Sequence, residues 1–358
     1  MEVSQKKHYH WLDLLRFLAA LAVVFVHARG EVWETYSLLE PSSQNTFTYI
    51  LYAILSQGFT GVIVFFVLSG FLVGGRTCEK IYNKTADAKQ YAVDRIVRIG
   101  LPLMGSILLI IIVDFVLGKS SDFVMLAGNV FALQGIFVRD AGGVFWTLSY
   151  EMWFYCLIFA LILLCNNKKA LLGGGVLLLS FAAFTALQTH YLLILICGIF
   201  SYYLARTRQQ KSNVVMIVSL IGFFISVLGK MLSVTSNSFD MSRFGFINGN
   251  VMTVLIGGFA ALFISDVVLR KPKASLAVCI DKVGSKLAVF SYSLYLTHWQ
   301  VLRVVNHFIG RTSTIDATAL FKYAVTILIC VVFAYLFYLL TEKHTAVVKR
   351  KALKIIGK

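Results

Sequence analysis

Charged residues are scarce in this sequence of 358 residues, because Asp, Glu, Lys and Arg together make up only 14% of it. A soluble domain usually carries about a quarter. Only three prolines are present, which argues against a loop-rich architecture. None of the six cysteines falls in a segment that we assign to the outer side, so we predict free thiols. They form no CxxC motif and no Cys/His cluster with metal-ligand spacing, so we predict no metal site. Apolar residues dominate instead, at 58% of the chain with 29 phenylalanines.

The apolar residues are gathered in runs near the ~20 residues that a helix needs to cross a bilayer. They predict an all-α polytopic membrane protein with about ten transmembrane helices. The stretch 123–138 is also apolar but shorter, and is predicted to be re-entrant or interfacial; if it spans, the count becomes eleven and the C-terminus moves outside. The predicted spans are 11–28, 50–74, 100–117, 146–165, 170–188, 191–205, 214–232, 249–269, 288–309 and 319–341.

The formal net charge of +16 does not indicate nucleic-acid binding, because the cations lie in short breaks between apolar runs. With the N-terminus inside, 24 Lys and Arg residues fall in internal segments and six in external ones. This bias follows the positive-inside rule and predicts that both termini are cytoplasmic. We therefore expect a multi-pass protein of the inner or plasma membrane. The first apolar run is predicted to be a retained helix rather than a cleaved signal peptide, and 1–358 a single membrane domain with no appended soluble domain.

Titratable side chains inside a membrane span are costly, so each is a functional candidate. Arg16 and His27 lie eleven positions apart in the first predicted span, which places them on one helix face with a rise of about 16 Å between them. They are predicted to line a groove with an anion clamp at its inner end and a proton acceptor at its outer end. Alternatively, Arg16 snorkels to the inner headgroups and His27 lies in the outer interface. Asp13 is placed to pair with Arg16 or to remain a solvated interfacial charge.

Glu151 lies about one and a half turns into the fourth span, at a predicted depth similar to that of His27. A carboxylate at that depth needs a partner or becomes protonated. We predict a His27–Glu151 pair in which the carboxylate orients a basic imidazole. The alternative is a purely structural buried pair.

Arg95 and Arg98 precede the third span and are neighbours on a helix. Two guanidinium groups form a fork suited to phosphate oxygens, although an ordinary positive-inside anchor would also place arginines here. His298 falls near the middle of the ninth span, where it is a second catalytic or donor-contacting candidate or a hydrogen-bonded packing residue. The Ser69–Gly70 step of the second span permits close helix packing.

Together these segments resemble the acyltransferase 3 family of integral membrane O-acyltransferases, from Trp11 to about Trp299. The family often has a proline shortly after the last histidine, whereas this sequence continues Trp299-Gln300-Val301. The segments that carry the resemblance are the Arg16-to-His27 spacing, the Phe-Phe-Val-x-Ser-Gly-Phe of 65–71, the Arg-x-x-Arg of 95–98, the Trp-Thr-Leu-Ser-x-Glu of 146–151 and the Tyr-Ser-x-Tyr-Leu-x-His of 292–298.

The resemblance implies about ten helices, acyl-CoA as donor and a sugar or other hydroxyl as acceptor. It implies that Arg16 and His27 are essential and that Arg95 and Arg98 meet the CoA phosphates. Tyr295 and His298 are also predicted to contact the donor.

The residues thus predict an O-acyltransferase that moves an acyl group, most simply acetyl, from cytoplasmic acetyl-CoA to a glycan or lipid-linked sugar beyond the membrane. His27 is the predicted general base and Glu151 its orienting group, with a ping-pong route through an acyl-histidine as the competing mechanism. No permanently bound cofactor and no nucleic-acid partner are expected, and membrane lipids surround the chain. A transporter that uses the intramembrane Arg, His and Glu residues is the alternative function. A non-catalytic scaffold would leave these polar groups unexplained.

Overall fold

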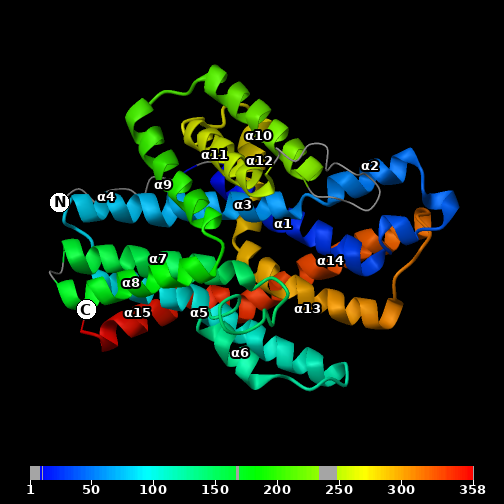
Figure 1. Cartoon of the computed structure of the whole chain (residues 1–358), viewed down its shortest axis with the longest axis horizontal. Coiled ribbons are helices and arrows are strands. Elements are labelled where there is room, and N and C mark those ends of the chain that lie inside the picture. Colours follow the sequence, from blue (N-terminus) through cyan, green and yellow to red (C-terminus); the bar gives the residue numbers. More distant parts are fainter. Residues whose placement is uncertain (1–8, 10, 167–168, 234–247, 358) are drawn as a thin grey trace. The chain divides into compact units, whose positions relative to one another are not determined.

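The computed structural model describes residue 9 and residues 11–166, 169–233 and 248–357. Of the residues that the structure describes, 80% are helical and none forms a strand. Its helices are drawn in chain order in Figure 1. The all-α prediction is therefore confirmed.

Seven helical segments of the described chain are long and apolar enough to cross a membrane. A shorter apolar helix, α8 (Ala170–Ala186), adds to them. Each overlaps one of the predicted spans. The seven segments are Thr46–Tyr82 (α2 Thr46–Leu55, α3 Gly58–Ser69, π-helical η3 Gly70–Gly75 and α4 Arg76–Tyr82), α5 Ala88–Val116, α7 Trp146–Cys165, α9 His190–Arg208, α10 Asn213–Leu232 of the helix Asn213–Ser233, α11 Gly249–Val267, and Ala317–Ile355 (α14 Ala317–Leu340, η5 Glu342–His344 and α15 Thr345–Ile355).

Two further helices have a similar length but carry more polar side chains. These are α1 (Leu12–Val32) and α13 (Ser291–Ile309). They correspond to the first and ninth predicted spans, and they are the helices that bear His27 and His298. The multi-pass character is thus clear, whereas the count of ten and the cytoplasmic termini stay predictions.

The apolar stretch 123–138 does not form a spanning helix. It contains α6 (Phe123–Val130), whose eight residues reach only about 12 Å, followed by a turn in which Gln134 and Val138 pair. This corresponds to a short helix and loop between α5 and α7, and it adds no eleventh span.

Helix starts are set by short acidic or amide side chains that accept a hydrogen bond from the first turn. Asp87 caps α5, Asp122 caps α6 and Asp316 caps α14, in each case through the backbone N–H three residues later. With 29 residues, α5 reaches about 44 Å, longer than the ~30 Å hydrocarbon core. A helix of this length crosses the hydrocarbon only if it tilts or if one end extends beyond it.

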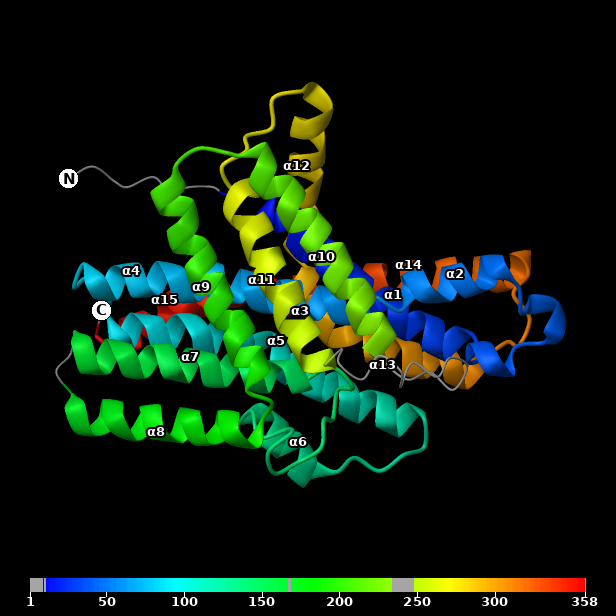
Figure 2. The ribbon, with the colours of Figure 1, turned by 45° about the horizontal axis from the view of Figure 1, so that its top comes forward.

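The chain divides into two compact units. Among the described residues, the first comprises 9, 11–18, 63–76, 193–233 and 248–289, and the second comprises 19–62, 77–166, 169–192 and 290–357. In the second unit, α7 packs beside α8 and α13 beside α14 (Figures 1 and 2). In the first, α10 packs beside α11. The prediction of a single membrane domain stays a prediction.

Close helix packing in the first unit depends on two glycines. A side chain on Gly70 would collide with the carbonyl of Leu195, and one on Gly198 would collide with the carbonyl of Val67. The backbones of η3 and α9 thus touch directly, which confirms the predicted packing role of the Ser69–Gly70 step.

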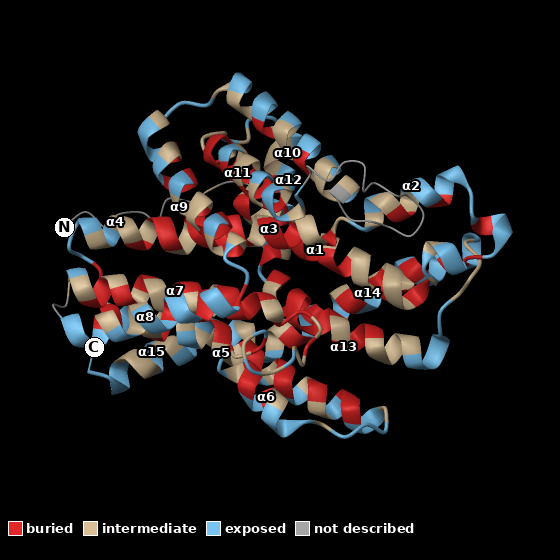
Figure 3. Cartoon of the chain, in the orientation of Figure 1, coloured by how far each residue is buried: buried red, intermediate tan, exposed pale blue. Residues whose placement is uncertain are grey.

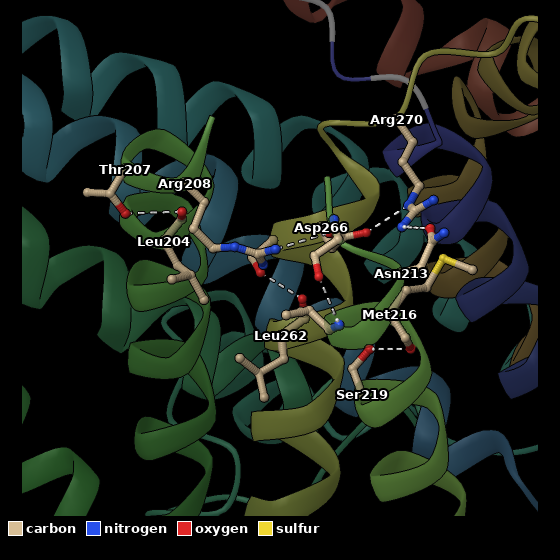
Figure 4. A network of polar contacts seen from close by, with 12 residues as sticks. Leu204, Thr207, Arg208, Asn213, Met216, Ser219, Leu262, Asp266 and Arg270 are labelled. Carbon is tan, nitrogen blue, oxygen red and sulfur yellow. Dashed lines mark hydrogen bonds and ion pairs between the residues drawn. The ribbon is translucent and has the colours of Figure 1, made fainter. Parts of the chain in front are cut away.

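A buried carboxylate connects three segments of the first unit. Asp266 at the end of α11 is fully buried and accepts hydrogen bonds from Arg270 Nε at 2.7 Å and from the Ser212 backbone N–H at 2.6 Å. Arg208 at the end of α9 lies 3.4 Å away (Figure 4). Two cations around one carboxylate satisfy a charge that would otherwise be costly to bury.

Large apolar side chains remain exposed on the outer helices. Figure 3 shows exposed residues along α8 and α10, which include Leu171, Leu178 and Phe224. A water-soluble surface rarely exposes continuous apolar faces of this kind, whereas lipid tails cover them well. All six cysteines are free thiols.

Candidate active site

Two histidines from distant parts of the chain meet in the second unit. His27 Nδ1 on α1 lies 2.9 Å from His298 Nε2 on α13. The two rings are nearly coplanar and meet edge to edge, with centroids 5.2 Å apart and planes inclined by 8°. His298 is fully buried, whereas His27 is partly accessible. The contact therefore has a buried side and a side that a substrate can approach.

The hydrogen bonds fix which nitrogen of each neutral ring carries the proton. His298 Nδ1 lies 3.0 Å from the carbonyl oxygen of Leu294. A carbonyl only accepts, so this nitrogen is the donor and His298 Nε2 is left with a lone pair. His298 Nε2 then accepts from His27 Nδ1–H, which leaves the lone pair of His27 on Nε2. His27 Nε2 is thus a proton acceptor.

A tryptophan ring forms one wall beside His27. Trp299 is oriented edge-on to His27, with centroids 5.1 Å apart and planes inclined by 78°. Gly143 in the loop before α7 packs on this indole, because a methyl group there would lie 2.5 Å from Trp299 Nε1. Gly143 also has a φ of 74°, a conformation that favours glycine. The loop can approach the indole only because residue 143 is glycine.

Asp140 holds the same loop in place. Its carboxylate accepts hydrogen bonds from the backbone N–H groups of Gly142 at 2.8 Å and Trp146 at 3.0 Å. Burial raises the pKa of Asp140 above its ordinary value, and the backbone hydrogen bonds counteract this only in part. Asp140 thereby links the loop to the first turn of α7.

Tyr295 joins α13 to the start of α7. Its hydroxyl donates to the carbonyl oxygen of Val144 at 2.9 Å and lies 2.8 Å from the Thr147 hydroxyl. Its ring centroid is 6.1 Å from that of His298. The hydroxyl is thus used within the protein, and the predicted contact of Tyr295 with the donor stays a prediction.

The sequence predicted Glu151 as the hydrogen-bond partner of His27. That prediction is wrong, because His298 is the partner of His27 in the structure. Glu151 Oε1 instead accepts from the Tyr155 hydroxyl at 2.6 Å and acts electrostatically on Tyr292. The prediction paired His27 with Glu151 because both lie at a similar predicted depth in their own helices. Depth alone does not show which helices pack against each other. A role of Glu151 in the reaction stays a prediction.

Arg95 lies beside the hydrogen-bond partner of Glu151, because its guanidinium is 5.5 Å from the ring centroid of Tyr155. Arg98 and Glu151 are both within electrostatic range of Tyr292. We call Arg95, Arg98, Glu151, Tyr155 and Tyr292 the α5–α7–α13 cluster. It brings both predicted phosphate-binding arginines to the same place as the α7 carboxylate.

Arg16 belongs to the first unit. Its Nη1 atom lies 3.2 Å from Asp13 Oδ1, one turn earlier on α1. This confirms the pairing of Asp13 with Arg16. The proposed contact of Arg16 with a donor stays a prediction.

Sequence reasoning missed three residues of this region: Trp299, Gly143 and Tyr292. The Gly142–Gly143 step directly before the Trp146 segment was the available sign of a close backbone approach. Trp299 directly follows His298, and Tyr292 begins the 292–298 segment, but neither was singled out as a site residue.

Comparison with known families identifies the chain as a whole. The acyltransferase domain of the acyltransferase 3 family matches residues 9–339. The chain belongs to the acyltransferase 3 family. No curated protein and no solved structure matches the chain significantly. The protein is thus a membrane acyltransferase, and His27, His298 and the α5–α7–α13 cluster all lie inside the matched region of this acyltransferase.

Proposed function

We propose that this acyltransferase transfers an acetyl group from acetyl-CoA on the cytoplasmic side to a hydroxyl group of an extracytoplasmic or lipid-linked glycan. The observation that carries the proposal is the hydrogen-bond chain from Leu294 through His298 to His27. This chain leaves His27 Nε2 as an acceptor on the accessible side of the pair. Acyl transfer to a hydroxyl needs such a base.

In the proposed reaction, the acceptor hydroxyl gives its proton to His27 Nε2 while its oxygen attacks the thioester carbonyl. The C–S bond then breaks, and the leaving thiolate takes the proton back from His27, so that free CoA and the O-acetyl ester are formed. While His27 is cationic, its Nδ1–H bond to His298 strengthens, because hydrogen bonds to ionised groups are stronger than neutral ones. His298 thus replaces Glu151 as the proposed orienting group.

The α5–α7–α13 cluster is the proposed donor site of this unit. Arg95 and Arg98 supply guanidinium groups that match phosphate oxygens. Glu151, through Tyr155, is proposed to position this cluster rather than His27. Arg16 is a further proposed contact of the donor. We also propose that the protein lies in the inner or plasma membrane with both termini cytoplasmic.

A transfer assay with purified protein in nanodiscs tests the proposal. Acetyl-CoA labelled in its acetyl group is supplied with glycans from cells that lack the protein, and the label is located by mass spectrometry and NMR. We expect labelled glycan with the wild type, and a loss of about 10²- to 10⁴-fold with His27→Ala. The matched control is His307→Ala, because His307 is an exposed histidine on the same helix as His298. Unchanged transfer by His27→Ala would remove the proposed base.

The same labelled donor separates the two mechanisms. In direct transfer, protein incubated with donor alone and then denatured carries no label. Label found on His27 would establish the ping-pong route through an acyl-histidine.

A further inference from the structure

Arg29, in the last turn of α1, is a partly buried cation whose charge no described residue compensates. Its guanidinium forms no ion pair and no hydrogen bond within the described part of the chain, and its Nε atom is buried. Of the two acidic residues that follow it, Glu31 pairs with Arg311 at 3.2 Å, and Glu34 forms no ion pair with Arg29. A buried charge without a partner is costly, so this end of α1 carries a positive charge that favours an anion.

The buried side of Arg29 rests on an aromatic cluster. The guanidinium carbon lies 4.9 Å from the ring centroid of Tyr52 on α2. Trp33, directly after α1, contacts both Tyr52 and Tyr323 of α14, with ring centroids 5.8 Å and 4.6 Å apart. The hydroxyls of the two tyrosines already donate to backbone carbonyl oxygens, at 2.8 Å and 3.0 Å. The cluster therefore fixes the arginine, but the attraction between a cation and a ring offsets only a part of the cost of burying the charge.

The other end of the guanidinium of Arg29 is accessible. Its Nη1 and Nη2 atoms also lack a partner among the described residues, yet they are not buried as Nε is. The N–H groups of a guanidinium form a planar fork that matches two oxygens of one anion. A ligand can thus reach the terminal nitrogens while the aromatic cluster holds the arginine from behind.

The depth of Arg29 in the protein indicates which anion it meets. Helix α1 ends three residues after Arg29, and the two long apolar segments that contain Tyr52 and Tyr323 each begin six residues before these tyrosines. Tryptophan and tyrosine rings near the ends of membrane helices lie at the level of the lipid headgroups. The phosphate groups of lipids lie at the same level.

We propose that Arg29 binds the phosphate group of a membrane lipid at the interfacial end of α1. This phosphate has two sources, an anionic phospholipid and the lipid carrier of a lipid-linked glycan. The second source would make Arg29 an acceptor-binding residue, and only that part of the inference rests on the proposed function.

Two pairs of lipids that differ by a phosphate group test the proposal. Phosphatidylglycerol is compared with diacylglycerol of the same chains, and farnesyl phosphate, a short analogue of a lipid carrier, with farnesol. Native mass spectrometry of the delipidated protein in a neutral detergent gives the Kd of each lipid. For Arg29→Met we expect binding of at least one phosphate lipid to weaken about tenfold or more, because hydrogen bonds to a charged group are lost. Binding of diacylglycerol and farnesol should not change.

Thermal unfolding separates a ligand site from a structural role. Methionine keeps an apolar stem against the Tyr52 ring and removes the unpaired charge, so Arg29→Met should unfold at or above the wild-type temperature in detergent without lipid. The phosphate lipid should then raise the unfolding midpoint of the wild type but not that of the variant. Lys322→Met is the charge-matched control, because Lys322 is exposed on α14 next to Tyr323 in the sequence. This control should behave like the wild type.

The results of the binding series are distinct. A loss confined to phosphatidylglycerol supports a phospholipid site, a loss confined to farnesyl phosphate supports a site for the lipid-linked acceptor, and a loss with both supports a general lipid-phosphate site. Unchanged binding of both phosphate lipids by Arg29→Met, or an equal loss in Lys322→Met, would overturn the proposal. A marked drop in the midpoint of Arg29→Met without lipid would also overturn it, because Arg29 would then be structural. None of these measurements needs acetyl transfer, so an absence of transfer by the wild type would refute the proposed function alone.

Discussion

His27 and His298 are 271 residues apart in the chain, yet their Nδ1 and Nε2 atoms lie 2.9 Å apart. A neutral imidazole takes the place that a carboxylate occupies in hydrolytic triads. The hydrogen bond engages His27 Nδ1 without placing a negative charge beside it in a largely buried contact, where an ionised group is costly.

Replacing His298 tests its orienting role. His298→Leu removes the acceptor for His27 Nδ1–H, and we expect kcat to fall about 10- to 100-fold, the worth of a hydrogen bond to a charged group. His298→Gln can still present an acceptor oxygen and should recover most of the loss. The KM for acetyl-CoA should stay near the wild-type value in both. Equal rates for the Leu and Gln variants would contradict the orienting role.

Gly143→Ala tests whether the loop positions Trp299 beside His27. The new methyl group would collide with the indole, so we expect a shifted ring and a transfer rate at least several-fold lower, with the protein still folded. Gly118→Ala is a matched control, since Gly118 has a similar φ of 65° but nothing within 4 Å of an added methyl group. The Gly118→Ala variant therefore has the same kind of backbone strain from a positive φ, but its methyl group collides with no other residue. A similar loss of rate in both variants would argue against a role of the indole.

The helices were predictable because hydrophobic length alone decides them. The predicted span 146–165 coincides with α7, and 170–188 agrees with α8 to within two residues. His27 and His298, which the structure brings together, were also singled out, because a titratable group in an apolar run stands out. What the sequence could not supply was the neighbour of each group: His27 was assigned to Glu151 by depth, whereas the packing of α13 brings His298 there. Contacts between helices depend on crossing geometry, which no single-helix pattern contains.

Gly70→Val tests the backbone contact between η3 and α9. The added side chain would collide with the Leu195 carbonyl, and overpacking of this kind costs about 1–3 kcal/mol. We expect a lower yield of folded protein and a lower thermal unfolding midpoint in detergent. Gly174→Val on α8, where an added methyl group meets nothing within 4 Å, should unfold at nearly the wild-type temperature. If both variants match the wild type, the two backbones are not held in contact.

Asp140→Asn tests how the loop before α7 depends on pH. Burial raises the pKa of Asp140 above its ordinary value of 3.8, so within the window from 3.8 up to that raised value the folded protein binds more protons than the unfolded chain. Stability contributed by this group is therefore full below pH 3.8 and falls as the pH rises through the window. The Asn variant lacks this pH-dependent contribution to stability. It also loses one acceptor for the Trp146 N–H at every pH, which costs about 1 kcal/mol.

The unfolding midpoint of Asp140→Asn should consequently lie furthest below that of the wild type near pH 3.5, and the gap should narrow toward pH 7. Thermal unfolding followed by tryptophan fluorescence in detergent gives both curves. Asp122→Asn, at the exposed cap of α6, controls for the loss of a carboxylate as such. A gap that widens with pH would mean that the backbone hydrogen bonds to the carboxylate outweigh its burial, and the loop would then be stabilised by the charged form of Asp140.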